Sequence, residues 1–141
     1  MAAGALVSTD ADSLAGAVAR HHIANLLYTY IDIADRKDVA AAVDLLGAAR
    51  VRFPHAGYHS ADAAPSFFTG LWAAPTAHRH DVTNLQVHRD RGDLWRADAH
   101  YTRWIIAPDP VLHTLGRYTL TVDSETWSIT ELIVDRTWTR G

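Results

Sequence analysis

The sequence contains no cysteine, a single lysine and no long run of apolar residues. Without cysteine the chain forms neither disulfides nor thiolate metal sites, and a cysteine nucleophile is excluded. No apolar segment approaches the ~20 residues that a helix needs to cross a bilayer, so we expect no membrane partner. The lack of disulfides is consistent with a cytoplasmic location. Residues 1–8 also lack the basic start and apolar core of a signal peptide.

The chain also lacks a large excess of charge of either sign. The net charge is −3, and the 13 basic and 16 acidic residues are mixed along the chain. Because no row of Lys and Arg could follow a phosphate backbone, we do not expect nucleic acid as a partner. The 141 residues are 48% hydrophobic and 21% charged, a composition typical of a globular protein. A chain of this length can bury a core without further staples.

Helical spacing of apolar residues dominates the first half of the chain. Residues 1–9 are small and weakly patterned, so we expect a loose N-terminal arm followed by a single domain over 10–141. Asp10 or Asp12 can cap the first helix, and Asp38 can cap the second. The spacing predicts helices from about residue 10 to 37, from 38 to 46 and from 61 to 74, with a loop at 55–60.

Alternation of polar and apolar residues replaces this pattern in the second half. A short strand is predicted at 51–53, followed by four strands at about 79–89, 93–107, 111–123 and 126–138. Helices followed by an antiparallel meander predict the α+β class, with the helices packed on one face of a curved sheet.

Three short patterns resemble a known family. They are Tyr30 with Asp35-Arg36-Lys37-Asp38 and Leu45-Leu46, then His80-Asp81-Val82-Thr83-Asn84, and then Gly116-Arg117-Tyr118 with Trp127-Ser128-Ile129. In this order the chain resembles the nuclear-transport-factor-2-like superfamily, and more closely its SnoaL-like branch, over about residues 14–138. The resemblance implies a cone-shaped α+β barrel, in which about three N-terminal helices pack on a strongly curved antiparallel sheet. It also implies a homodimer formed through the outer sheet faces.

The resemblance further implies a catalytic pair. Scytalone dehydratase and hexachlorocyclohexane dehydrochlorinase, which belong to this superfamily, use an Asp–His pair whose members match Asp35 and His80. In such a pair the carboxylate fixes the imidazole tautomer and stabilises its protonated form, so the histidine can transfer protons near neutral pH. Asp32, one helical turn earlier, is the competing carboxylate. We expect no cofactor and no metal, because this chemistry needs only a proton shuttle and correct positioning.

A small-molecule pocket is expected on the concave side of the sheet. The residues expected to line it are Tyr30, Asp32, Phe53, Phe68, Trp72, Asn84, His100, Tyr101, Trp104 and Tyr118. Strand alternation leaves open whether His100 or Tyr101 faces inward. His78, His80 and His100 form the one histidine pattern that could hold zinc or iron. We favour the interpretation that they are separate surface and pocket residues.

The predicted function is that of a cofactor-free dehydratase, isomerase or cyclase. Its substrate would be a small, mostly apolar polyketide-, terpenoid- or aromatic-like molecule in an enclosed pocket. One alternative is a non-catalytic binding or assembly domain of the same fold. Another is addition of water to an epoxide, which would need an Arg–Asp pair in the cavity, formed by Arg103 or Arg117 with Asp98.

Overall fold

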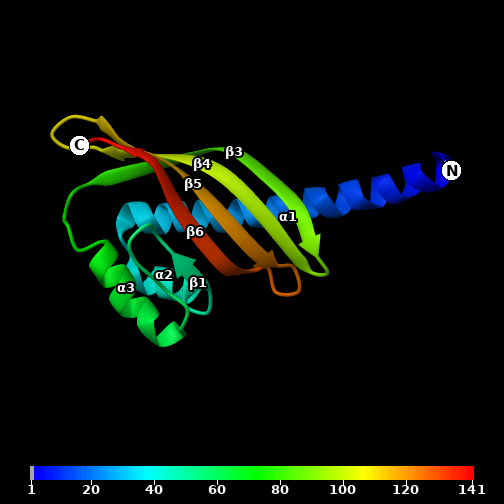
Figure 1. The fold of residues 1–141 in the computed structure, drawn as a ribbon, viewed down its shortest axis with the longest axis horizontal. Coiled ribbons are helices and arrows are strands. Elements are labelled where there is room, and N and C mark those ends of the chain that lie inside the picture. Colours follow the sequence, from blue (N-terminus) through cyan, green and yellow to red (C-terminus); the bar gives the residue numbers. More distant parts are fainter. Residues whose placement is uncertain (1) are drawn as a thin grey trace.

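A curved sheet wraps around one long helix in the computed structural model, which describes the backbone of residues 2–141 and the side chains of residues 12–141 (Figure 1). Short helices and strands follow the long helix, and a four-stranded meander completes the chain. The elements are α1 (Ala2–Arg36), α2 (Val39–Leu46), β1 (Arg50–Arg52), β2 (Gly57–Tyr58), η1 (Ala61–Ala63), α3 (Ala64–Leu71), β3 (His78–Arg91), β4 (Leu94–Ile105), β5 (Val111–Asp123) and β6 (Ser128–Thr139).

The first helix begins earlier than its capping residues predicted. Its backbone is helical from Ala2, ahead of both Asp10 and Asp12, and this end projects past the sheet in Figure 1. The early start is consistent with the many alanines there, because alanine has the highest helix propensity. The sequence predicted a loose arm at residues 1–9, and the side chains of this segment lie outside the described residues.

The next elements follow local sequence signals, with two exceptions. Asp38 caps α2 as predicted, and its side chain accepts the backbone N–H of Ala41 at 3.1 Å. The segment 55–60, predicted as a loop, contains β2, whose Tyr58 pairs with Val51 of β1. A two-residue strand is too short to show alternation. The third helix, predicted to start at residue 61, opens as a 3₁₀ turn and ends at Leu71.

The sheet is open and mixed. Its strand order is β2-β1-β6-β5-β4-β3, so the cone does not close into a complete barrel. The four long strands form the predicted antiparallel meander, and β1 adds to β6 in the parallel direction. Three helices pack against this sheet, as the α+β prediction required (Figure 1).

The core lies between α1 and the concave face of the sheet. Residues Ile23, Leu27 and Tyr30 recur at helical spacing and are almost fully buried. On the sheet, Tyr101 and Tyr118 are buried and point to this inner side. The sequence left open whether His100 or Tyr101 faces inward. In the structure the Tyr101 side of β4 faces inward.

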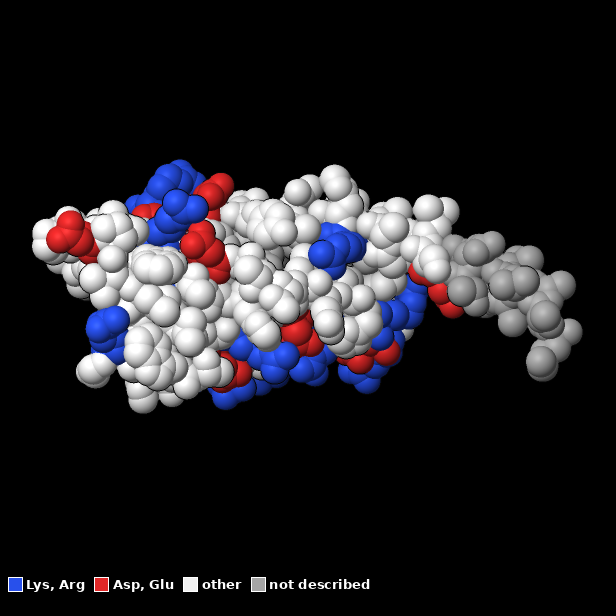
Figure 2. All heavy atoms as spheres, turned by 90° about the horizontal axis from the view of Figure 1, so that it is seen from above, with Lys and Arg blue, Asp and Glu red and all other residues white. Residues whose placement is uncertain are grey.

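The helices and the surface charges agree with what the composition predicted. Within the described part of the chain, no helix combines the length and apolar character needed to cross a bilayer. On the face drawn in Figure 2, Lys and Arg lie interspersed with Asp and Glu rather than in one basic patch.

A close approach at Gly116 generates the first prediction. A Cβ atom there would overlap the Tyr101 ring and the backbone carbonyl of Asp135. We predict that Gly116→Ala lowers the free energy of unfolding by roughly 1–3 kcal/mol, measured by urea denaturation. Gly70→Ala is the matched control, because a Cβ on this helical residue meets nothing within 4 Å. Equal losses in the two variants would contradict the packing described here.

Candidate active site

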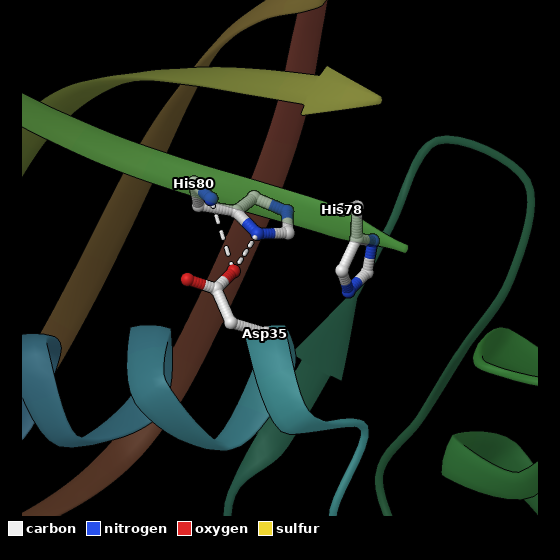
Figure 3. Close-up of side chains that lie close together, drawn as sticks. All are labelled: Asp35, His78 and His80. Atoms are coloured by element: carbon white, nitrogen blue, oxygen red, sulfur yellow. Dashed lines mark hydrogen bonds and ion pairs between the residues drawn. The ribbon is translucent and has the colours of Figure 1, made fainter. Parts of the chain in front are cut away.

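The last turn of α1 meets the first residues of β3. There, Oδ1 of Asp35 accepts two hydrogen bonds from His80, one from Nδ1 at 2.7 Å and one from the backbone N–H at 2.9 Å (Figure 3). The exposed fractions of the two side chains are 26% for Asp35 and 10% for His80. One carboxylate oxygen therefore fixes both the backbone and the ring of His80.

The hydrogen bond determines the tautomer of His80. A carboxylate only accepts hydrogen bonds, so Nδ1 of His80 carries the hydrogen, and in the neutral ring Nε2 has the lone pair. His80 lines a cavity, and its ring lies beside that of Tyr101 with centroids 6.0 Å apart. In this state Nε2 can accept a proton from a molecule in the cavity, and Asp35 stabilises the resulting imidazolium.

His78, two residues earlier on β3, has a different role. Its Nε2 donates to the backbone carbonyl of Ala34 at 2.7 Å, so Nδ1 is the acceptor for Nε of Arg103 at 3.1 Å. Burial, which outweighs the Ala34 hydrogen bond, lowers the pKa of His78 to about 4. His78 is thus a neutral structural histidine that ties β3 to the end of α1.

The donor atoms of Asp35, His78 and His80 all lie within 4.8 Å of one another. This trio does not fit a metal ion. Both ring nitrogens of His78 are already hydrogen-bonded, and one of them faces the positive guanidinium of Arg103. The other histidine of the predicted metal pattern, His100, is exposed on the outer face of the sheet.

A cavity of about 180 Å³ opens beside His80. An apolar cavity of ~150 Å³ holds a benzene molecule, so this one encloses about one six-membered ring. The residues that line it are Tyr30, Ala34, Phe53, Leu71, Trp72, His78, His80, Tyr101, Arg103, His113, Thr114, Tyr118, Val134 and Arg136.

Five of the predicted pocket residues line this cavity, namely Tyr30, Phe53, Trp72, Tyr101 and Tyr118. Five others do not, and each has a physical reason. Asp32 lies on α1 with an exposed side chain. Phe68 of α3 is fully buried in the core. His100 and Trp104 alternate with Tyr101 on β4, so they face outward. Asn84 is exposed at a bulge of β3, with a φ of 58°.

Some lining residues were not predicted. His113 is the extra residue of a bulge opposite Arg103 and Trp104, so it reaches the cavity beside Thr114. Arg136 enters because β6 pairs it with Gly116, which in turn pairs with Tyr101. Because Arg103 lies two residues after Tyr101, strand alternation along β4 could have predicted that both face the cavity. The positions of His113 and Arg136 depend on a bulge and on long-range strand pairing, which leave no local signal in the sequence.

The Arg–Asp pair that epoxide hydration would need is not formed in the cavity by the predicted residues. Asp98 and Arg117 lie on the outer side of the sheet, where Asp98 accepts a hydrogen bond from Thr119 at 3.1 Å. Only Arg103 of the three candidates lines the cavity. The prediction based on Arg103 or Arg117 with Asp98 is therefore wrong for this site.

Three tyrosines form the inner wall. The rings of Tyr101 and Tyr118 stack with centroids 4.3 Å apart, and Tyr30 meets Tyr118 edge-on at 5.9 Å. Burial raises the pKa of all three phenols, so they remain protonated. The three hydroxyls form no hydrogen bond with any described protein group. Since every fully buried polar atom of the described side chains has a hydrogen-bond partner, these hydroxyl oxygens are not fully buried. The hydroxyls are therefore available to a molecule in the cavity.

Comparison with known proteins identifies the fold. No family model and no curated protein matches the sequence. A hexachlorocyclohexane dehydrochlorinase from Novosphingobium barchaimii is 16% identical, with a TM-score of 0.74 over 93% of this chain and 92% of that one. A protein proposed to be a scytalone dehydratase, from Novosphingobium aromaticivorans, is 16% identical, with a TM-score of 0.72 over 87% of each chain. The chain has the nuclear-transport-factor-2-like fold.

A third solved structure has the same nuclear-transport-factor-2-like fold. It is a proposed aromatic ring hydroxylase from N. aromaticivorans, 23% identical, with a TM-score of 0.71 over 84% of this chain and 89% of that one. The predicted cone-shaped architecture is confirmed by these likenesses. At such identities these likenesses show the fold alone.

The depressed pKa of His78 predicts an acid sensitivity of folding. Between 6.5, the ordinary value, and about 4, the unfolded chain binds a proton that native His78 does not. The free energy of unfolding is therefore highest above pH 6.5. It falls by roughly 2–3 kcal/mol as the pH drops from 6.5 to about 4.

Urea denaturation of the wild type and of His78→Gln measures this effect. The stability advantage of the wild type should shrink between about pH 7 and about pH 4.5, because only the wild type carries the titrating group. An advantage that stays constant over this range would contradict the neutral, buried state of His78.

Proposed function

We propose that the protein is a cofactor-free acid–base enzyme of the dehydratase, isomerase or cyclase type. Its substrate is a small organic molecule whose reacting part is about one ring in size. The observation that carries this proposal is the state of His80: Nδ1 is held by Asp35 at 2.7 Å, while the ring lines the cavity. This is the arrangement that a general base requires.

The proposed reaction begins with removal of a proton from carbon. Nε2 of His80 takes the proton from a C–H bond next to a carbonyl, and the electron pair moves to the substrate oxygen. The hydroxyls of Tyr30, Tyr101 and Tyr118 are available to donate hydrogen bonds to that oxyanion. In an elimination, the oxyanion re-forms the carbonyl, a double bond forms to the β-carbon, the bond from that carbon to the leaving group breaks, and the His80 imidazolium protonates the departing group. In an isomerisation, the electron pair moves to another carbon of the conjugated enolate, and that carbon takes the proton from the imidazolium.

The named activities of the structural neighbours support this direction. Dehydrochlorination and dehydration, in the names of two of them, are both eliminations that need a base and a leaving group. The donor set of the cavity also favours proton transfer by side chains, because His78 has no free lone pair for a metal.

Proton transfer can be tested before the natural substrate is known. A panel of small cyclic ketones, β-hydroxy ketones and β-halo ketones is incubated with the protein in D₂O. Loss of C–H signals and release of leaving groups are followed by NMR. We expect the wild type to catalyse exchange or elimination on members of this panel, and His80→Gln and Asp35→Asn to lose about 10²–10⁴-fold in rate. Chelation should leave the wild-type rate unchanged.

Asp32→Asn is the matched control, because Asp32 lies one turn from Asp35 on the same helix but is exposed. It should retain the wild-type rate. If Asp32→Asn loses activity and Asp35→Asn does not, the wrong carboxylate has been assigned. If His80→Gln retains the full rate, the acid–base proposal fails and a binding or assembly role is favoured.

A homodimer through the outer sheet face remains part of the proposal. Leu115 and Trp138 are paired in register on this face, and both are exposed large apolar side chains. Trp104 and Leu112 form a neighbouring pair on the same side. Exposed apolar patches of this kind mark association surfaces. Sedimentation at micromolar concentration should give the mass of two chains, and a monomer there would refute the dimer.

A further inference from the structure

Two arginines line the cavity together with His80. Arg103 comes from β4, two residues beyond Tyr101, and Arg136 comes from β6 opposite Gly116 of β5. The two guanidinium groups therefore reach one cavity from strands on either side of β5.

Neither charge has an acidic partner among the described side chains. The ion pairs there join Arg36 to Asp38, Arg79 to Asp81, His80 to Asp35 and Arg96 to Asp98. The carboxylate of Asp35 is already bonded to His80, and Asp135 shares the outer face of the sheet with Arg117.

The hydrogen bonds of Arg103 leave its charge unneutralised. Its Nε donates to His78 at 3.1 Å and its Nη1 to Nδ1 of His113 at 3.2 Å, and both acceptors are neutral rings. Burial and then repulsion by Arg136 lower the pKa of Arg103, which nevertheless stays charged. Arg103 is half-buried, whereas Arg136 is exposed at the rim of the cavity. The cost of holding the partly desolvated Arg103 beside a second cation is reduced when an anion lies between them.

We propose that Arg103 and Arg136 bind a carboxylate on the substrate. A guanidinium matches a carboxylate in a planar, two-bond geometry, and the cavity has room for about one ring beside it. This inference rests on the proposed function in one respect: the bound carboxylate would position the ring against Nε2 of His80. It narrows the substrate from a mostly apolar molecule to a small cyclic or aromatic acid.

Benzoate and its neutral analogue benzamide are the probes. Isothermal titration of the wild type should show benzoate binding about tenfold or more tightly than benzamide. Arg136→Gln should abolish this preference without changing benzamide binding, and Arg136→Lys should keep part of it. Arg136 is the residue to change because Arg103 also holds His78 and His113.

Arg117→Gln is the matched control, because Arg117 is an exposed arginine on the outer face of β5. It should leave the preference for benzoate intact. Equal affinity of the wild type for the two probes, or no benzoate binding, would overturn the proposal. An unchanged preference in Arg136→Gln would overturn it as well.

The same titration with His80→Gln separates this inference from the proposed function. Because the carboxylate contacts are made by the arginines, His80→Gln should still prefer benzoate. If that preference persists while His80→Gln also retains full proton-transfer activity, the acid–base proposal fails and the anion site stands. If His80→Gln abolishes activity but the wild type does not prefer benzoate, the anion site fails and the acid–base proposal stands.

Discussion

The contact between the end of α1 and the start of β3 is the interaction on which the site depends. Two hydrogen-bonded histidines make it: His78 donates to the carbonyl of Ala34, and His80 donates twice to Asp35. The first bond involves a neutral, buried ring that fixes the backbone of β3. The second leaves one nitrogen of His80 available to the cavity. Structural and chemical roles are thus divided between neighbouring inward-facing residues.

Other features shape the space around this contact. Gly116 has no side chain, so Tyr101 can lie over it and stack on Tyr118. A bulge in β5 adds His113 to the lining, and pairing across β5 brings in Arg136. The result is a cavity of one-ring size lined by His80, three tyrosines and two arginines that have no acidic partner among the described side chains. The proposed proton transfer on an anionic molecule would use these groups together.

Much of the fold could be predicted from the sequence, because helical spacing and strand alternation are local properties. The cap at Asp38 and the four-stranded meander are examples. The pairing of Asp35 with His80 was implied by resemblance. The rest depends on non-local geometry: strand alternation alone could not choose between His100 and Tyr101. Arg136 reaches the cavity through long-range strand pairing, which leaves no local signal in the sequence.

The proposed site depends on which ring nitrogens of His80 and His78 carry hydrogen, and long-range ¹H–¹⁵N NMR correlation measures this directly. In the neutral rings we expect opposite tautomers, with hydrogen on Nδ1 of His80 and on Nε2 of His78. Asp35→Asn should perturb the His80 pattern and leave that of His78 intact. A neutral His80 with hydrogen on Nε2 and none on Nδ1 would contradict this assignment, because the nitrogen not bonded to Asp35 could not then act as a base.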